Sequence, residues 1–143
     1  MTINPQFIAY ILSTAVKLSG LAPLPQEGAP EFVAKPIKIL REEACHSEIP
    51  NCERAMAYYD INNNQIIFPD HFNLDSYIHC SFLVHESVHA LQAAKYGKKM
   101  YDSCAALVQT ENLAYDVQNR YLFENGEFAK FANPIRFMKC PSE

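Results

Sequence analysis

Three residues whose side chains can bind a metal or transfer a proton are His85, Glu86 and His89. They form the pattern His-Glu-x-x-His within an apolar, glycine-free run. Such a run predicts a helix. Residues four apart lie on one helical face, so His85 and His89 can direct their imidazoles at one ion. Glu86 lies roughly 100° around the helix from His85, close enough to address a water held by that ion. Two imidazole ligands and a neighbouring general base are what a hydrolytic zinc site requires, so the motif predicts a Zn²⁺ site.

The alternative interpretation of this motif is a pair of partly exposed histidines on a surface helix. The residues that flank the histidines are apolar, namely Leu83, Val84, Val88 and Leu91. A helix with apolar side chains on several faces is typical of a buried position. The flanks therefore favour the zinc site.

A catalytic zinc ion normally has three protein ligands and one position open to water. Glu111 stands in the middle of a mainly apolar stripe at helical spacing, which is formed by Cys104, Leu107, Val108, Tyr115, Gln118 and Leu122. A carboxylate in such a stripe must be paired or bind a metal, because burying it alone costs several kcal/mol. We expect Glu111 to be the third ligand, and an ion pair with a lysine or arginine is the alternative. Asp116 belongs to the opposite, polar face and is the weaker candidate.

Two helices are expected to position these ligands. The first covers residues 75–96 and ends at Gly97, and the second runs from residue 102 or 103 to residue 124, before Asn125 and Gly126. Glycine and asparagine are frequent where helices end. The tail that follows, residues 127–143, contains two prolines and is expected to be mostly irregular, with a short helical turn near residues 128–131.

The remaining elements complete an α+β fold. Residues 55–60 and 65–68 are β-rich and are joined by a segment with three asparagines, which predicts a hairpin. Residues 32–40 are predicted to form a strand that Pro36 places near a sheet edge. The expected architecture is an N-terminal helix, a small antiparallel sheet with a hairpin, and a metal-binding helix packed on a second long helix.

The N-terminal apolar run, residues 7–21, has two possible interpretations. An export signal is disfavoured, because no basic residue precedes the run, Lys17 interrupts it and Pro23 lies where cleavage would occur. The run is also too short for a membrane span. Asn4 can cap a helix, Pro5 suits the first turn and Gly20 can end it. We therefore expect an amphipathic helix of the folded domain and, with a slight preference only, a cytoplasmic location.

The composition of the 143-residue chain is that of an ordinary globular protein, with 49% hydrophobic and 20% charged residues. We expect one domain, residues 1–143. The net charge of −4 and the absence of a Lys/Arg cluster exclude nucleic acid as a general partner. The expected partner is a peptide or protein substrate.

The five cysteines leave at least one thiol unpaired in a monomer. Cys45 and Cys52 flank a short polar segment and can close a loop in an oxidising compartment. Cys80 and Cys104 fall on apolar helical faces, which predicts buried thiols without a disulfide. A second zinc site formed by Cys45, His46 and Cys52 is a less favoured alternative, because the spacing matches no common structural cluster.

The two predicted helices resemble the core of the gluzincin metallopeptidases, the thermolysin-like clan, in its small single-domain forms (minigluzincins). The matching segments are His85-Glu86-Ser87-Val88-His89, continued by Ala90-Leu91-Gln92, and Glu111-Asn112-Leu113-Ala114-Tyr115. The resemblance covers about residues 75–122. It implies that His85, His89 and Glu111 bind zinc and that Glu86 activates water. The clan also places an edge strand beside the cleft, where an extended substrate can pair with it.

Two departures from the clan concern the surroundings of the metal. Larger members carry an aspartate one turn after the glutamate ligand, to support a metal histidine, and Tyr115 occupies that position here. Larger members also use a later histidine to stabilise the oxyanion, and this sequence has no histidine after His89. Tyr115, Tyr121, Arg136 or an upstream histidine are the alternatives for that role. His79 is expected to have a packing or surface role.

The resulting hypothesis is a hydrolase in which zinc activates a water, Glu86 takes its proton and the nucleophile attacks a peptide carbonyl. No covalent intermediate is needed, so no cysteine or serine nucleophile is required. One alternative is a zinc-stabilised binding module that keeps the scaffold without catalysis. Another is a peptidase that cleaves a single partner protein.

Overall fold

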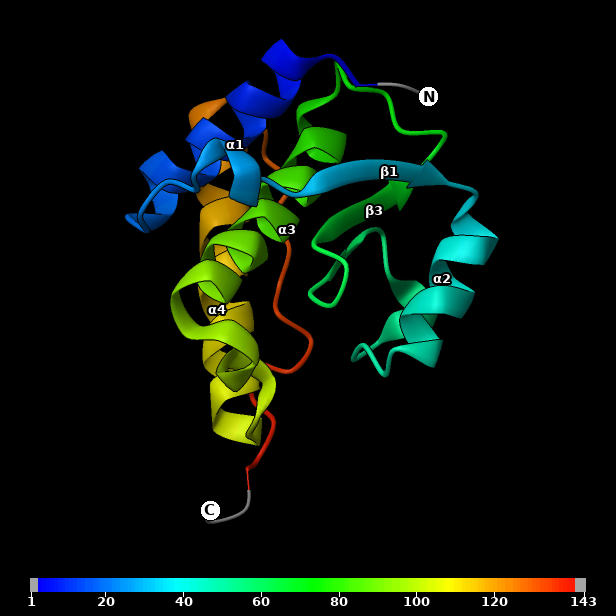
Figure 1. Cartoon of the computed structure of the whole chain (residues 1–143), viewed down its shortest axis with the longest axis vertical. Coiled ribbons are helices and arrows are strands. Elements are labelled where there is room, and N and C mark those ends of the chain that lie inside the picture. The colour runs from blue at the N-terminus through cyan, green and yellow to red at the C-terminus, as the bar shows by residue number, and fades with distance from the viewer. Residues whose placement is uncertain (1–2, 141–143) are drawn as a thin grey trace.

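The computed structural model describes residues 3–140 and has the predicted α+β fold (Figure 1). Its helices and strands follow in the order α1 (Pro5–Ser19), β1 (Glu31–Lys35), α2 (Ile37–His46), β2 (Tyr58–Asp60), β3 (Gln65–Pro69), α3 (Tyr77–Tyr96) and α4 (Cys104–Glu124). Three short 3₁₀ turns lie between them, η1 (Gln26–Gly28), η2 (Cys52–Arg54) and η3 (Gly97–Tyr101).

The sheet has three strands in the order β1-β3-β2. The hairpin of β2 and β3 is antiparallel, as predicted, and Asn64 in its turn adopts a φ of 50°. β1 pairs with β3 in parallel, however, so the prediction of an antiparallel sheet is wrong. The reason is the route between β1 and the hairpin, which passes through α2 and β2 and returns β3 in the direction of β1.

The predicted strand over residues 32–40 is correct only up to Lys35. Pro36 ends the strand and occupies the N-cap of α2, which the sequence reading missed. Leu40 and Ala44, four residues apart, are fully buried in a small core against Tyr58 and Ile67. Burial of this helical stripe under the sheet outweighs the β propensity of the isoleucines at the start of α2.

Helix α1 forms as its capping residues predict. The Asn4 side chain accepts a hydrogen bond from the Phe7 N–H at 2.8 Å, and Gly20 ends the helix with a φ of 74°. The helix packs against α3 and α4 and buries Ile11, Ala15 and Leu18. None of the helices that the structure describes is long and apolar enough to cross a membrane.

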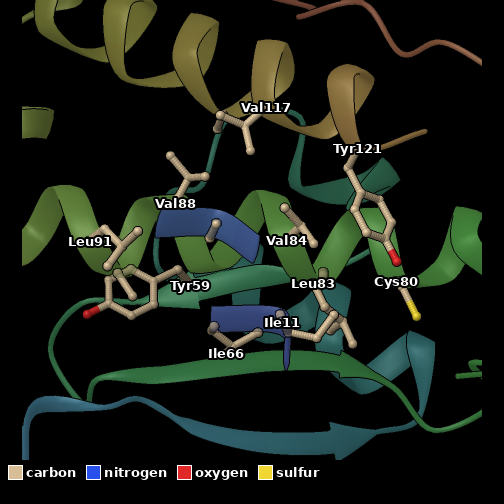
Figure 2. Packing of buried hydrophobic residues seen from close by; sticks show 14 of the residues in the cluster. Ile11, Tyr59, Ile66, Cys80, Leu83, Val84, Val88, Leu91, Val117 and Tyr121 are labelled. Atoms are coloured by element: carbon tan, nitrogen blue, oxygen red, sulfur yellow. The ribbon is translucent and has the colours of Figure 1, made fainter. Parts of the chain in front are cut away.

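The main core lies around α3. In Figure 2, α3 runs between α4, which contributes Val117 and Tyr121, and the strands that carry Tyr59 and Ile66. The strand β3 is buried on both faces, because Ile66 and Phe68 belong to this core whereas Ile67 faces α2. α3 is consequently covered on several sides, and every residue from position 83 to position 92 is buried.

Two disulfides are present among the described residues. Cys45 pairs with Cys52, as the sequence allows, and Cys80 is a buried free thiol, as predicted. The prediction that Cys104 is unpaired is wrong, because it is bonded to Cys140. Cys104 lies in the first turn of α4, where the returning tail can reach it. Pairing of Cys45 with Cys52 also removes the thiolates needed for a zinc site with His46.

The tail after α4 is irregular, as predicted, but the helical turn expected near residues 128–131 is absent. The turn lies instead at residues 134–137.

Candidate metal centre

Helices α3 and α4 bring the three predicted metal ligands together. His85 and His89 lie one turn apart on α3, Glu111 faces them from α4, and the ligand atoms all lie within 4.8 Å of one another. His85 Nε2 is 3.6 Å from Glu111 Oε2, and His89 Nε2 contacts Glu111 Oε1 directly. Ligand atoms of a tetrahedral zinc site are about 3.3 Å apart for bonds of about 2.0–2.1 Å. The buried group could therefore hold a metal ion.

The side chain of Gln118 determines which nitrogen of His85 faces the metal position. Ser81 Oγ donates its proton to the Ile78 carbonyl, at 2.6 Å, so it must accept from the Gln118 amide nitrogen at 3.1 Å. The carbonyl oxygen of Gln118 then points at His85 Nδ1, 2.9 Å away. An oxygen acceptor requires a protonated Nδ1, and the lone pair on His85 Nε2 is left for a metal.

An independent chain of hydrogen bonds orients His89 in the same way. The amide nitrogen of Gln92 donates to the Thr110 carbonyl at 3.1 Å, which can only accept. The carbonyl oxygen of Gln92 therefore faces His89 Nδ1, at 2.8 Å. Both imidazoles present Nε2 to the same point, each held by a buried glutamine. Oriented support of this kind is typical of metal-binding histidines.

The charges within the cluster support Glu111 as its anionic member. Burial raises the pKa of Glu111, but the neighbouring imidazoles outweigh burial and hold that pKa far below its ordinary value. Burial lowers the pKa of His89, whereas Glu111 outweighs burial and raises it to about 9. Glu111 is therefore an anionic carboxylate at neutral pH. These contacts pair Glu111 with His85 and His89 and not with a lysine or arginine, which was the alternative.

Glu86 lies beside the cluster, with Oε2 3.9 Å from His85 Nε2. Burial raises its pKa, while the two histidines and a hydrogen bond from the Tyr59 backbone N–H act in the opposite direction. The bond to Tyr59 ties the carboxylate of α3 to strand β2. Glu86 thus lies next to the His85, His89 and Glu111 cluster without being one of its members.

The cluster opens into a cleft of about 440 Å³. One wall comes from the segment before and within β2, and the opposite wall comes from α4 and the C-terminal tail. The cleft is lined by Ile49, Pro50, Asn51, Arg54, Ala55, Met56, Ala57, Tyr58, Tyr59, Phe82, His85, Glu86, His89, Tyr101, Leu107, Glu111, Tyr115, Gln118, Phe131, Ala132, Pro134 and Ile135. A cleft of this size and with this lining has room for part of an extended peptide.

Two tyrosines in the cleft have hydroxyls that stay protonated. Burial and the charges of Glu86 and Glu111 raise the pKa values of both Tyr101 and Tyr115. The Tyr115 ring also packs edge-on against His85, with centroids 4.5 Å apart. Sequence reasoning named Tyr115 but missed Tyr101, because nothing in the local pattern of η3 indicates that it returns to the metal site.

The other candidates for supporting the oxyanion lie elsewhere. Tyr121 is hydrogen-bonded to the Tyr10 hydroxyl at 2.8 Å, and it does not line the cleft. Arg136 is exposed and does not line the cleft either. His79 accepts a hydrogen bond from the Asn73 N–H and stacks on Phe72, so it has the packing role expected of it. Asp116 is exposed on α4 and is not a member of the metal cluster.

Comparison of the chain with protein-family models, with curated proteins and with solved structures yields no significant match. The site is a buried His-His-Glu group at the floor of a cleft.

Proposed function

We propose that this chain is a zinc-dependent peptidase of the gluzincin type. The observation that carries the proposal is the convergence of His85 Nε2, His89 Nε2 and the Glu111 carboxylate beside Glu86 in an open cleft. Two imidazoles and one carboxylate, with space for a fourth ligand, form the ligand set of catalytic zinc rather than of a closed structural site.

The surroundings of the ligands support zinc through residues that differ from those of the larger gluzincins. Gln118, two turns after Glu111, takes the supporting role toward His85, and Tyr115 packs on the ring without bonding to its Nδ1. A neutral amide acceptor holds the histidine in the metal-binding tautomer, as a carboxylate or a carbonyl would.

Zinc, when bound, would lower the pKa of a coordinated water and polarise a substrate carbonyl. Glu86 is placed to take the proton of the attacking water and to deliver it to the leaving amine. Tyr101 and Tyr115 are placed to donate hydrogen bonds to the carbonyl oxygen as negative charge develops there. β2 is an outer strand of the sheet, and an extended peptide can pair with a strand in such a position.

Three amide variants test the proposal. Glu86→Gln removes the general base and should leave zinc bound, while peptide hydrolysis falls by about two to four orders of magnitude. Glu111→Gln removes an anionic ligand and should lower both zinc affinity and stability, because metal binding is coupled to folding. Asp116→Asn makes the same change at an exposed position of α4 and should alter neither property.

The measurements are zinc content by elemental analysis and cleavage of a peptide library, each with and without a chelator. Hydrolysis by Glu86→Gln at the parent rate would refute the catalytic assignment. A parent protein that binds zinc but cleaves no library peptide would favour the zinc-stabilised binding module instead.

A further inference from the structure

The C-terminal strap, residues 127–140, forms part of the wall of the metal cleft. Four of its residues line the cleft, namely Phe131, Ala132, Pro134 and Ile135. Figure 1 shows the strap in orange to red, returning along α4 on the side that faces the sheet and α2. The strap has no helix or strand of its own, so its position depends on contacts with other elements.

Three attachments hold the strap antiparallel to α4. The Asn119 side chain donates to the Phe131 carbonyl at 2.7 Å and accepts from the Phe131 N–H at 2.8 Å. Asn133 donates to the Asn112 side chain at 2.9 Å, and its own oxygen accepts from the N–H two residues later. The disulfide between Cys104 and Cys140 fastens the far end. Each attachment joins a later strap residue to an earlier residue of α4.

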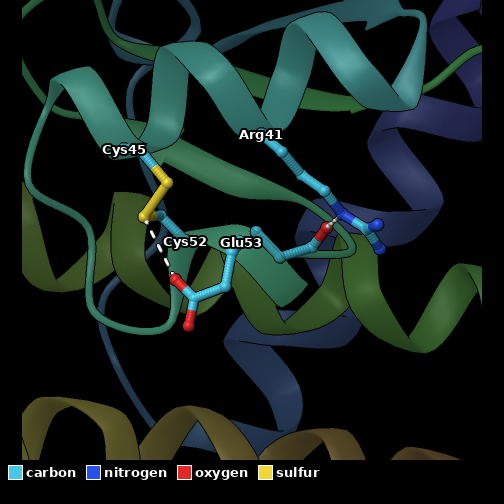
Figure 3. Close-up of a disulfide and its surroundings, with 5 residues drawn as sticks. Arg41, Cys45, Cys52 and Glu53 are labelled. Carbon is cyan, nitrogen blue, oxygen red and sulfur yellow. Dashed lines mark hydrogen bonds between the residues drawn. A yellow bond between two sulfur atoms is a disulfide. The ribbon is translucent and has the colours of Figure 1, made fainter.

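The opposite wall is fastened in a similar way. Figure 3 shows the disulfide between Cys45 and Cys52. This disulfide closes the loop that carries Ile49, and Ile49 lines the cleft. From α2, Arg41 donates to the Ala55 carbonyl at 3.1 Å and approaches the Met56 sulfur at 3.6 Å. Each wall therefore includes an irregular segment that a disulfide and side-chain hydrogen bonds fix in place.

The residues that the two walls present to the cleft are mainly apolar. Phe131 packs on Phe82 of α3 with ring centroids 4.9 Å apart, and both rings belong to the lining. Ile135 is 8% exposed. Met56 and Ile49 belong to the lining of the opposite wall. A side chain between these walls loses water contact on both sides, and the free energy gained grows with its apolar area.

We propose that the strap is the specificity-determining wall of the cleft, which selects a substrate with a large apolar side chain next to the scissile bond. The Cys104–Cys140 disulfide and Asn119 keep Phe131 in the position that makes this selection. The inference rests on the proposed peptidase function, whose substrate it narrows to peptides with residues such as leucine or phenylalanine at that position.

The strap also contains a phenylalanine that serves as a matched control for replacement of Phe131. Phe137 belongs to the same segment but is 84% exposed and does not line the cleft. Phe131→Ala and Phe137→Ala therefore delete the same atoms from the same strap, one inside the cleft and one outside. A third variant replaces both Cys104 and Cys140 by serine, which releases the end of the strap and leaves all lining residues unchanged.

The probes are the hydroxamates of N-acetylleucine and N-acetylalanine, which bind a catalytic zinc ion and differ only in the apolar side chain. Their affinities for the zinc-loaded protein are measured by calorimetry, together with zinc content and melting temperature for each variant. The parent should prefer the leucine probe by at least about tenfold, because even one methylene in an apolar pocket is worth about tenfold or more.

Phe131→Ala and the double serine variant should reduce this preference to below about threefold at unchanged zinc content, while Phe137→Ala retains it. If Phe131→Ala does not fold, the double serine variant gives the same ratio with an intact lining. Equal affinity of the parent for both probes, or an unchanged preference in Phe131→Ala, would overturn the proposal. A leucine preference that depends on Phe131 in a protein that cleaves no library peptide would support the role of the strap and would favour the zinc-stabilised binding module over the peptidase.

Discussion

Replacement of Gln118 by methionine tests the architecture of the metal site at a residue that touches no metal. Gln118 is fully buried, its oxygen accepts from His85 Nδ1 and its nitrogen donates to Ser81. Methionine has a similar length and removes both hydrogen bonds without opening a large cavity. The protonated Nδ1 of His85 then has no acceptor in a buried position.

The expected cost follows from the hydrogen bonds that are lost. An unsatisfied buried donor costs about 1–3 kcal/mol. His85 can avoid this cost by moving its proton to Nε2, where Glu111 Oε2 lies 3.6 Å away, but that tautomer cannot bind a metal through Nε2, the nitrogen that faces the cluster. Zinc binding must reverse the change, so the cost appears in the affinity. We expect zinc affinity to fall by about 10–100-fold, which agrees with the usual effect of removing such supporting groups.

The assay is a zinc titration in competition with a chromophoric chelator, with circular dichroism to verify the fold. The control is Gln109→Met, which makes the same replacement at an exposed position of α4. Gln92→Met should behave as Gln118→Met does, since Gln92 holds His89 in the same way. A zinc affinity for Gln118→Met within twofold of the parent would refute the reasoning that the amide selects the metal-binding tautomer.

Two further predictions concern the thiols and the pH dependence of the site. Thiol titration of the denatured, unreduced protein should find only Cys80 reactive, and a second reactive thiol would contradict the pairing. Replacing Cys104 and Cys140 by serine should lower the free energy of unfolding in urea by about 4 kcal/mol, because the disulfide closes a loop of 36 residues. Zinc affinity should rise about tenfold per pH unit from pH 7 and flatten near pH 9, because Glu111 raises the pKa of His89 to about 9 and zinc must displace that proton. A flat profile between pH 7 and 9 would show that His89 is already neutral at pH 7.

The features that the sequence predicts correctly are those encoded over short distances along the chain. The caps of α1 and the turn of the hairpin follow from asparagine and glycine at the ends of regular segments. The pairing of His85 with His89 follows from the period of the helix, because residues four apart share a face wherever the helix lies. Glu111 could be singled out because a carboxylate within an apolar stripe needs a partner, whatever the partner is.

The missed elements depend on what the segment packs against. The start of α2 has isoleucines that suit a strand. The four-residue spacing of Leu40 and Ala44 favours a helix because the sheet beneath buries both side chains. The parallel pairing of β1 with β3 is likewise a consequence of the α2 crossover. β propensity is a weak guide in such segments, because burial against neighbours determines the outcome.

The sequence alone determined the chemistry, namely which residues could bind a metal and which could act as a base. Only the tertiary structure decided how that chemistry is supported. Gln118 reaches His85 across 33 positions of the chain, and Cys104 reaches Cys140 across 36. Local periodicity places a residue on a face of its own helix, but it carries no information about the side chain that a second, separately folded segment brings to that face.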